Sequence, residues 1–452
     1  MIYLKLVFLV SLSMATVMEW IPILVYVFTL RRGRSSTPAG RNVPESSSAS
    51  QYSTKHEVAA KQEVVTVPEV EGDWPKFCIM TTLRGADPRI AKNLQSVLDL
   101  DYPNFEWHLV IDHKDDPSHE ILDQVRQANS AHAQRLKVQV LRDRNPRRSL
   151  LCSSFLQIIE NLDDSFELVT FWDGDMLVRP DWLKQMARVM ADPSVGGTLG
   201  NRWYMPATNQ WGSLCRFIWN VGAVIPMWAM QIPWSGGLTM RLSDVRRSTL
   251  MQSWSTGLVE DAPTKKAITE LGKRMHFVPE LLVVNREDIT LGHCFQFILR
   301  QVLWTRLYHP NWPLVMIGTS FFTAAFFSPA LVAIGLVCCG YQTAAIWWAV
   351  LFLAYWFSQF AAVLTIDSAA QGLLTRHGEE SWPWGRGCLI RLFLAIPLTQ
   401  LAYFAATLKC SFVRSVDWRG IQYTFRGPHD VRMTEYRPYL ETTIARKSND
   451  SL

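Results

Sequence analysis

Residues 167–175 read ELVTFWDGD, an apolar run that ends in two carboxylates one residue apart. Its β-branched and aromatic residues predict a buried strand over Glu167–Trp172, and the glycine between the carboxylates permits a tight turn. The segment Val178-Arg179-Pro180-Asp181 then opens a predicted helix. Strand, tight turn and helix in this order are the beginning of an α/β unit.

Three more β-like runs lie upstream of this stretch, with helical patterns between them. They are Phe77–Thr82, Glu106–Ile111 and Lys137–Leu141. Alternation of this kind predicts a parallel α/β sheet that binds ligands at the carboxyl ends of its strands. The polar residues directly after each strand are therefore the first candidates for chemistry.

Asp173 and Asp175 are the strongest of these candidates. Roughly one Asp-x-Asp triplet is expected by chance in a chain of this length, and Asp99-Leu100-Asp101 is interpreted as that accident. The strand before Asp173 and the helix after Asp175 set this pair apart. Oxygen ligands on such a turn suit Mg²⁺ or Mn²⁺ shared with a diphosphate.

Two other acidic groups have a structural and a functional interpretation each. Asp112 closes the second strand; it is either part of an ordinary solvated loop or an acceptor for a nucleotide base or ribose. Glu260-Asp261 precedes the helical run Ala262–Gly272, where the helix dipole alone would explain it. Together with the small residues of Pro233–Gly237, where a substrate could approach the backbone, a general base becomes plausible.

Composition and hydropathy predict a membrane protein. Hydrophobic residues make up 48% of the 452 residues and charged residues 19%, which excludes a disordered or collagen-like chain. An apolar stretch over Leu6–Leu30 is followed by Arg31–Arg34, and we interpret it as an anchor that leaves the next domain in the cytoplasm. A cleaved signal peptide is the alternative. Glu19 is expected to face another helix or to lie outside the span.

Three apolar segments follow Pro313. Leu314–Cys339 and Gln342–Ile366 are long enough to span a bilayer. Cys388–Leu408 contains Arg391 and is marginal; a re-entrant or interfacial position would keep the basic tail cytoplasmic. The catalytic domain is then expected on the cytoplasmic side of a bacterial inner membrane or of an ER or Golgi membrane.

A basic and aromatic group stands just before these segments, at Arg300, Trp304 and Arg306. The tryptophan can be an interfacial belt residue, or the group can bind a sugar ring and a pyrophosphate. The net charge of +5 gives no argument for nucleic acid, and anionic lipid is the expected attraction. The eight cysteines lack metal-ligand spacing and are predicted to be reduced.

Acidic turn, Asp-x-Asp, Glu-Asp and a basic-plus-Trp motif before membrane spans, in this order, resemble the membrane-bound family-2 inverting glycosyltransferases, especially the ceramide glucosyltransferase type. The resemblance extends from Thr82 into the tail. It includes Leu83-Arg84-Gly85-Ala86-Asp87-Pro88, Asn93-Leu94, Leu100-Asp101-Tyr102-Pro103, Asp115-Asp116-Pro117, Asn145-Pro146-Arg147, Val259-Glu260-Asp261 and Val416-Asp417-Trp418-Arg419-Gly420.

The chain departs from that family at three positions. Leu303 stands where the motif Arg-x-x-Arg-Trp has its second arginine, so Arg306 is a candidate to replace that contact. Asp173-Gly174-Asp175 stands where the ceramide enzymes tend to have Asp-Ser-Gly. Leu199-Gly200-Asn201-Arg202 replaces an expected His-Gly step. These departures bear on the acceptor more than on the reaction.

The resemblance implies an α/β fold with a GT-A (Rossmann-like) catalytic domain, a UDP-sugar donor, a lipid acceptor and inversion. It implies that Asp112 and Arg84 hold the nucleoside, Asp173 the ribose, and Asp173 with Asp175 a Mg²⁺ or Mn²⁺ ion. Asp261, with Glu260, is the implied base. Arg300, Trp304 and Arg306 are implied to line the mouth of the site.

The predicted organisation is an N-terminal anchor (1–34), a Ser/Pro-rich linker (35–73), a GT-A domain (74–290), an interfacial region (291–312), transmembrane or interfacial helices (313–408) and a basic tail (409–452). The predicted function is transfer of a hexose, first glucose, to a lipid hydroxyl such as that of ceramide. A processive polysaccharide synthase of the cellulose or hyaluronan type is one alternative. A non-catalytic nucleotide-binding membrane protein is another.

Overall fold

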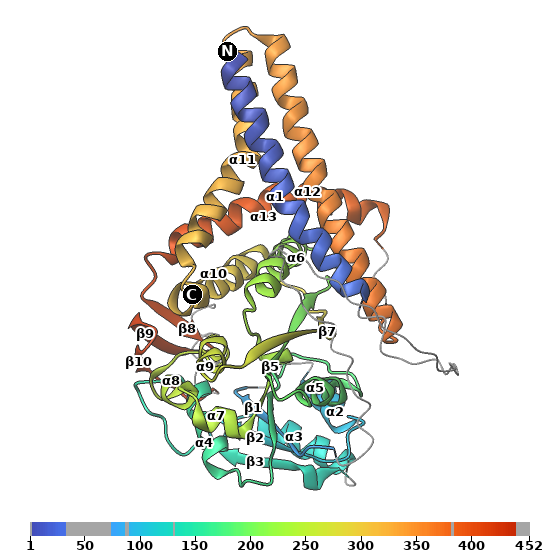
Figure 1. Ribbon diagram of the computed structural model, residues 1–452. Coiled ribbons are helices and arrows are strands. Elements are labelled where there is room, and N and C mark those ends of the chain that lie inside the picture. The colour runs from blue at the N-terminus through green and yellow to red at the C-terminus, as the bar shows by residue number, and fades with distance from the viewer. Residues whose placement is uncertain (1, 33–73, 86–89, 130–131, 381–383, 440–452) are drawn as a thin grey trace, which may run out of the picture.

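The computed structural model describes residues 2–32, 74–85, 90–129, 132–380 and 384–439. The predicted linker, residues 86–88 of the family-like stretch and the end of the tail lie outside these ranges. Figure 1 shows an α/β body at the bottom of the view and a stalk of long helices above it.

A seven-stranded sheet in the order β3-β2-β1-β4-β6-β5-β7 forms the centre of the body. Its first four strands in the chain lie within one residue of the predicted bounds: β1 Phe77–Leu83, β2 Phe105–Ile111, β3 Leu136–Val140 and β4 Leu168–Phe171. These four pair in parallel, as expected. The other three strands are β5 Val195–Tyr204, β6 Thr239–Arg241 and β7 Arg274–Asn285.

Strand β6, which was not among the predicted strands, runs antiparallel to both β4 and β5. The reason is its approach: the short helix η2, Ser235–Gly237, delivers the chain into β6 at the carboxyl edge of β4. A parallel strand would need a crossover to the opposite edge.

Helices cover both faces of the sheet, which confirms the predicted α/β class with a GT-A (Rossmann-like) body. On one face pack α2 Ile90–Leu98, α3 Ser118–Ala128 and α5 Trp182–Met190. On the other pack α4 Leu150–Asn161, α7 Leu242–Arg247 and α8 Leu250–Thr256. The short helix α9, Thr264–Glu270, precedes β7. The helix predicted to open after Asp181 is α5.

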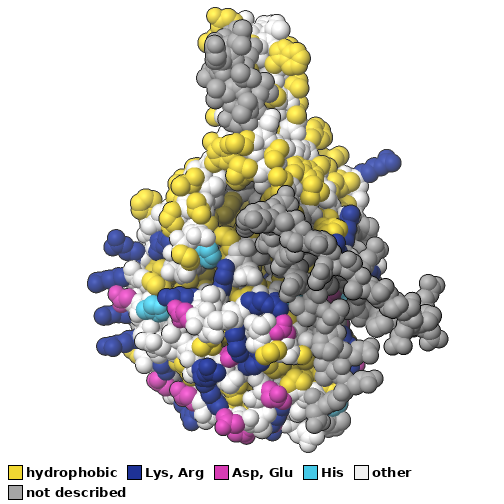
Figure 2. Space-filling view, viewed as in Figure 1, with side chains coloured by type: hydrophobic (Ala, Val, Ile, Leu, Met, Phe, Trp, Pro, Cys, Tyr) yellow, Lys and Arg dark blue, Asp and Glu magenta, His cyan; other side chains and the backbone are white. Residues whose placement is uncertain are grey.

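Among the described residues, three helices are long and apolar enough to cross a membrane: α11 Trp312–Cys338, α12 Gln342–Arg376 and α13 Arg386–Cys410. Figure 2 shows hydrophobic side chains over the stalk and charged ones over the body. In Figure 1, α13 runs across the base of the stalk. It packs on α6, Trp211–Met230, and α10, Leu291–Tyr308, which favours an interfacial position for this segment.

The N-terminal helix α1, Ile2–Arg32, packs along α12. Glu19 faces α12, which is one of the two positions expected for it. Tyr355 donates a hydrogen bond to the Glu19 carboxylate at 2.8 Å, and Gln359 donates a second one. The carboxylate is therefore satisfied by a neighbouring helix rather than left against lipid.

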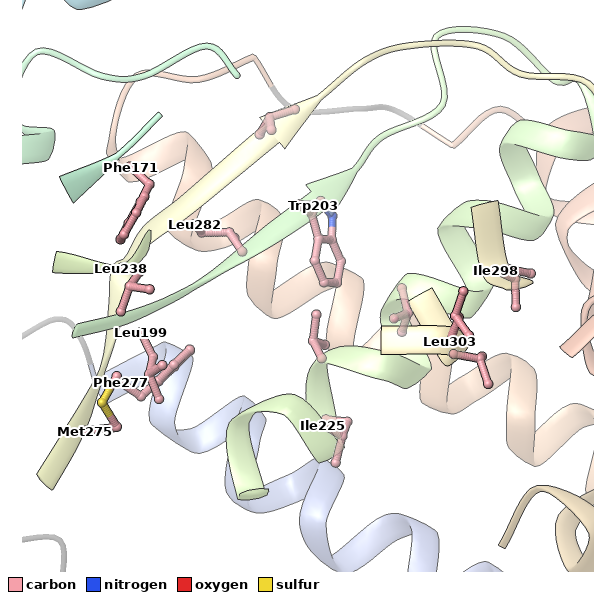
Figure 3. Packing of buried hydrophobic residues seen from close by; sticks show 14 of the residues in the cluster. Phe171, Leu199, Trp203, Ile225, Leu238, Met275, Phe277, Leu282, Ile298 and Leu303 are labelled. Carbon is pink, nitrogen blue, oxygen red and sulfur yellow. The ribbon is translucent and has the colours of Figure 1, made fainter. Parts of the chain in front are cut away.

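One continuous hydrophobic cluster joins the sheet to the helices beside the membrane stalk. Figure 3 shows Leu199 and Trp203 of β5, Ile225 of α6, and Ile298 and Leu303 of α10 in this cluster. Close packing of this kind transmits position, so the sheet and the interfacial helices hold each other in place. All eight cysteines are free, as predicted, and six of them are buried.

The segment predicted as a basic tail forms regular secondary structure in most of its described residues. β8 Ser415–Trp418, β9 Ile421–Gly427 and β10 Asp430–Glu435 form a three-stranded antiparallel sheet. Its hairpins return the chain to the α/β body: the Met433 amide donates to the Pro146 carbonyl at 2.7 Å, and the Leu150 amide donates to the Tyr423 hydroxyl at 3.2 Å.

Candidate functional site

The two carboxylates of the Asp-Gly-Asp turn converge on one guanidinium. Arg202 of β5 donates to Asp173 at 2.8 Å and to Asp175 at 2.9 Å. The Tyr204 hydroxyl accepts from the same guanidinium at 3.1 Å, and the Trp234 ring lies 4.6 Å from it. Nearby carboxylates raise the pKa of Arg202, so it is a permanent cation between them.

Arg202 is a site residue that the sequence reasoning missed. It appeared there only inside a departure from the family, Leu199–Arg202. One signal was available: it is the only charged residue of the ten in β5, whose other residues are apolar, small or polar. A lone arginine in a mostly buried strand needs an acidic partner.

Glu260 and Asp261 lie on the same acidic side of the site. Burial raises the pKa of Asp261 to about 7, and the charge of Asp173 adds to the rise. The pKa of Glu260 is raised well above its usual range by burial, then by Asp261 and Asp173. Burial also raises the pKa of Asp173, with Arg202 opposing the rise. These carboxyl groups are therefore close enough to share one electrostatic environment.

The helix-dipole explanation for Glu260 and Asp261 does not describe this geometry. Helix α9 begins at Thr264, two residues after the pair ends, and no side chain caps it. Its first turn holds no acidic residue. The backbone at Ala262 and Ser235 instead lies close enough to the Asp261 carboxylate to oppose the rise in its pKa.

Ser235 ties the two acidic groups together. Its hydroxyl donates to Asp173 at 2.8 Å, while its backbone contacts Asp261. The glycines that follow have a packing role: a Cβ on Gly237 would lie 2.3 Å from the backbone nitrogen of Gly200 in β5. The prediction that a substrate uses these small residues to reach the backbone is therefore not needed to explain Gly237.

Asp112 lies at the end of β2 in a basic nest. Its side chain is 3% exposed and forms an ion pair with Arg84. The Arg144 guanidinium lies 3.8 Å from the second carboxylate oxygen, Oδ1, and also donates to the Asp112 carbonyl at 2.6 Å. Burial raises the pKa of Asp112, and the two arginines oppose that rise. Asp116, on the same loop, accepts from the Gly85 amide at 2.9 Å.

Two atoms of this nest are buried without a hydrogen-bond partner: Asp112 Oδ1 and Arg144 Nε. They present an acceptor beside a donor. The two atoms form an ion pair with each other at 3.8 Å, which is longer than a hydrogen bond, so each can still pair with a ligand that has the complementary edge. Arg144 was not among the candidates from sequence; it stands next to Asn145-Pro146-Arg147, which was quoted for the resemblance.

The two arginines of α10, Arg300 and Arg306, have different surroundings. Burial lowers the pKa of Arg300, and the charges of Tyr204 and Asp175 oppose that change. The Trp304 ring lies 6.4 Å from that of Trp418 in β8. Arg306 donates to the Val413 carbonyl at 2.7 Å and to the Cys410 carbonyl, beyond the end of α13.

Arg306 as a replacement for the missing motif arginine stays a prediction. Its guanidinium caps the carbonyls at the end of α13. Leu303, at the motif position itself, is 1% exposed and belongs to the hydrophobic core. An arginine at 303 would be buried in apolar surroundings, so its absence here has a packing reason.

The residues present fit a divalent cation. Asp173 and Asp175 already reach a common cationic centre, which Arg202 supplies. Among the described residues no group of three or more His, Cys, Asp or Glu forms a closed cage. Mg²⁺ and Mn²⁺ sites that share one or two carboxylates with substrate phosphates need no such cage.

Comparison with protein-family models identifies the family of this chain. The family model of glycosyl transferase family 21 matches residues 47–429. Curated protein sequences give no match. The solved structure of mannosyltransferase PcManGT from Pyrobaculum calidifontis, in complex with GDP-Man and Mn²⁺, is 12% identical; the match covers 89% of this chain and 98% of that one, with a TM-score of 0.43.

Two further structures are similar at a greater distance. S. aureus TarS 1-349, in complex with UDP-GlcNAc, is 12% identical, and the match covers 80% of this chain and 100% of that one, with a TM-score of 0.33. Glucosyl-3-phosphoglycerate synthase from Mycobacterium tuberculosis, in complex with Mn²⁺, UDP and glucosyl-3-phosphoglycerate, is 12% identical and covers 51% and 80%, with a TM-score of 0.33.

Proposed function

Since the chain belongs to glycosyltransferase family 21, we propose that it transfers a hexose, glucose first among the candidates, from a UDP-sugar to the hydroxyl of a membrane lipid such as ceramide, with inversion. The observation that carries this proposal is the acidic cluster at the carboxyl edge of the sheet. There Asp261, with a pKa of about 7, shares one electrostatic environment with Asp173 of the Asp-Gly-Asp turn.

The nucleoside end of the donor is assigned to Asp112 and Arg144. The imide edge of uracil carries an N–H donor beside a carbonyl acceptor. Asp112 Oδ1 would accept from that N–H and Arg144 Nε would donate to that carbonyl, which satisfies both buried orphans. Arg84 supports this arrangement because its ion pair keeps Asp112 ionised.

The diphosphate end is assigned to the Asp-Gly-Asp turn. Asp173 would contact the ribose, and Asp173 and Asp175 would hold Mg²⁺ or Mn²⁺. Such an ion, when bound, offsets the charge that builds on the leaving nucleotide, an effect of several kcal/mol. Arg202 adds a fixed positive charge beside the same two carboxylates.

Asp261 is assigned as the general base. A carboxyl group with a pKa near the working pH combines a large ionised fraction with useful basicity. Asp261 is partly exposed and so can reach an acceptor hydroxyl. Glu260 is 5% exposed, and burial raises its pKa well above the usual range, which favours its neutral form. A neutral Glu260 adds no repulsion to the ionised base.

In the proposed reaction, Asp261 takes the proton of the acceptor hydroxyl as its oxygen attacks the anomeric carbon. The bond from that carbon to the diphosphate breaks on the opposite face, and UDP leaves. A single displacement of this kind inverts the anomeric centre and needs no covalent intermediate. The chain offers carboxylates for two separate roles: Asp261 as the base, and Asp173 with Asp175 as ligands for the donor.

The lipid acceptor is supported by the position of the site. The core that holds β5 also holds α6 and α10, which pack under α13 at the base of the apolar stalk. Leaving the bilayer would cost a lipid about 0.8 kcal/mol for each CH₂ exposed. A transferase that keeps its acceptor in the membrane therefore needs its base beside the membrane surface.

The test is Asp261→Asn in the detergent-solubilised full chain. The variant loses the proton acceptor alone, so transfer should fall by at least about 100-fold while UDP affinity stays within about twofold. Glu270→Gln is the matched control, because Glu270 is an exposed acid at the end of the adjacent helix α9. Equal turnover in both variants would remove Asp261 from the mechanism.

A further inference from the structure

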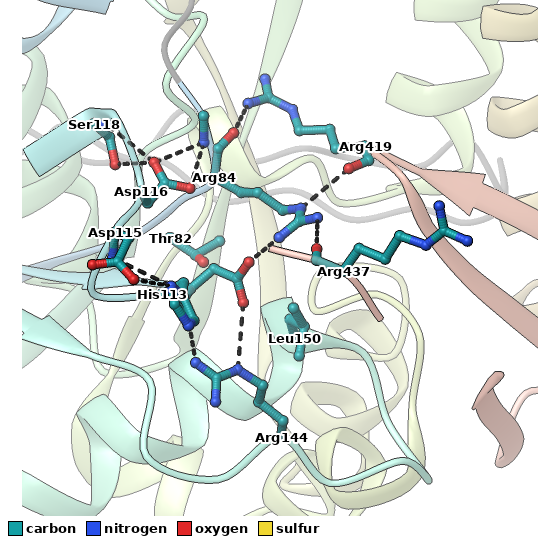
Figure 4. A network of polar contacts seen from close by, with 12 residues as sticks. Thr82, Arg84, His113, Asp115, Asp116, Ser118, Arg144, Leu150, Arg419 and Arg437 are labelled. Atoms are coloured by element: carbon teal, nitrogen blue, oxygen red, sulfur yellow. Dashed lines mark hydrogen bonds and ion pairs between the residues drawn. The ribbon is translucent and has the colours of Figure 1, made fainter. Parts of the chain in front are cut away.

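The C-terminal segment from Arg419 to Tyr439 returns to the nest around Asp112, although it lies more than 300 residues away in the chain. The Arg419 guanidinium donates to the Arg84 carbonyl at 2.5 Å. In return, Arg84 donates to the carbonyls of Arg419 at 3.1 Å and Arg437 at 2.6 Å. Figure 4 shows these bonds converging on Arg84 beside the carboxylate that it pairs with.

The turn that carries Arg419 has a shape that few residues adopt. Arg419 and Gly420 have φ angles of 51° and 82°, and they connect β8 to β9, where Trp418 pairs with Ile421. Two consecutive positive φ values match the twist of a two-residue hairpin. A non-glycine residue is uncommon in this region, and Arg419 is held in it by its hydrogen bonds with Arg84.

Two rings of the segment cover the nest. Tyr436 lies between two guanidinium groups, with its ring centroid 5.6 Å from Arg84 and 5.1 Å from Arg144. Tyr439 lies against Gly85, where a Cβ would be 2.3 Å from its ring. Asp112 and Arg84 are buried under this cover.

The Tyr436 hydroxyl is the third buried polar atom of this nest without a hydrogen-bond partner. It lies close enough to Asp112 to lower the pKa of that carboxyl, yet it does not meet hydrogen-bond geometry with it. With Arg144 Nε and Asp112 Oδ1 it completes a set of donor, acceptor and donor. The imide edge of uracil has the complementary order: carbonyl, N–H, carbonyl.

We propose that the C-terminal segment forms the outer wall of the nucleoside pocket and that Tyr436 donates a hydrogen bond to a carbonyl of the donor's pyrimidine base. This inference rests on the proposed function and adds a specificity-determining residue from outside the α/β body. Cytosine presents an acceptor where uracil presents N–H, so it would face the Asp112 carboxylate with a lone pair. The pocket therefore selects uridine.

The test measures ligand affinity in the full-length protein with Mn²⁺ present. Tyr436→Phe removes the hydroxyl and keeps the ring, so the affinity for UDP should fall about 5- to 50-fold, the effect of one lost buried hydrogen bond. Inorganic pyrophosphate makes no base contact, and its affinity should be unchanged. Tyr341→Phe is the matched control, because Tyr341 is exposed in the turn between α11 and α12.

Three other results would contradict the proposed role of Tyr436. If Tyr436→Phe binds UDP as the wild type does, Tyr436 does not contact the base. If UDP and pyrophosphate weaken equally, the hydroxyl acts on the fold of the site and the inference is wrong. If the wild type binds pyrophosphate but no UDP, the proposed donor is wrong, and the inference is wrong with it.

Discussion

The pKa of Asp261 predicts how transfer depends on pH. A base with a pKa of about 7 is roughly 9% ionised at pH 6 and roughly 91% ionised at pH 8. The rate at low substrate should therefore rise about tenfold between these pH values. An aspartate at its ordinary pKa of 3.8 would be fully ionised at both, and the rate would be flat.

The same pKa predicts that Asp261→Asn stabilises the fold above neutral pH. Between pH 3.8 and about 7 the folded carboxyl binds a proton that the unfolded one has lost, so stability falls as pH rises through this window. The pKa difference between the folded and unfolded states lowers the free energy of unfolding by at most about 4 kcal/mol. The real effect is smaller, because solvent screens a partly exposed side chain. Below pH 3.8 the difference vanishes.

The assay pairs initial rates of lipid glycosylation from pH 5 to 8.5 with thermal unfolding from pH 4 to 8.5, at constant ionic strength. Asp261→Asn should raise Tm at pH 8 by a few degrees, about what 1–3 kcal/mol gives in a chain this large, and leave Tm at pH 4 unchanged. A flat pH–rate profile, or a variant that is less stable than the wild type at pH 8, would refute the raised pKa assigned to the Asp261 carboxyl group.

Three further predictions address the cation centre and the turn beside it. Arg202→Gln leaves two carboxylates without their partner and should lower the free energy of unfolding by about 3 kcal/mol. Mn²⁺ should restore part of this loss. Arg246→Gln, which breaks an exposed ion pair, is the control and should gain less from Mn²⁺. Asp175→Ala should make UDP affinity insensitive to chelator; an equal chelator effect in variant and wild type contradicts the metal assignment. Gly237→Ala should destabilise by about 1–3 kcal/mol, measured by thermal unfolding, because its Cβ would overlap the Gly200 backbone; an unchanged Tm would show that β5 can move away.

Local patterns in the sequence predicted the centre of the body well. The apolar run before Asp173 forms β4, and the turn and helix after it are present. Such features depend on residues within about ten positions of each other, which periodicity and turn chemistry describe. The position of Asp112 at the end of β2 follows from the same reasoning.

Pairings between distant segments could not be predicted in this way. Arg202 meets Asp173 because β5 pairs with the short antiparallel strand β6, and nothing near Arg202 in the sequence specifies that pairing. Arg306 was assigned to the site as a replacement for the motif arginine that is missing at Leu303, on the same helix as Arg300. Six helical positions rotate a side chain by about 240°, so the two arginines face different neighbours.

The C-terminal segment gave the weakest signal. A stretch described as a basic tail forms three strands and places Tyr436 beside Asp112. Its short strands carry charges on both faces, so no clear alternation predicts them. The quoted element Val416–Gly420 marked the position of the hairpin turn but not its contact with Arg84.

The most direct test of the central claim is incubation of the purified full-length protein with radiolabelled UDP-glucose, Mn²⁺ and a total lipid extract. The account predicts one labelled lipid in the organic phase, with the anomeric configuration opposite to that of the donor. Label in a long polymer, retention of configuration, or no labelled lipid from any UDP-hexose would contradict it.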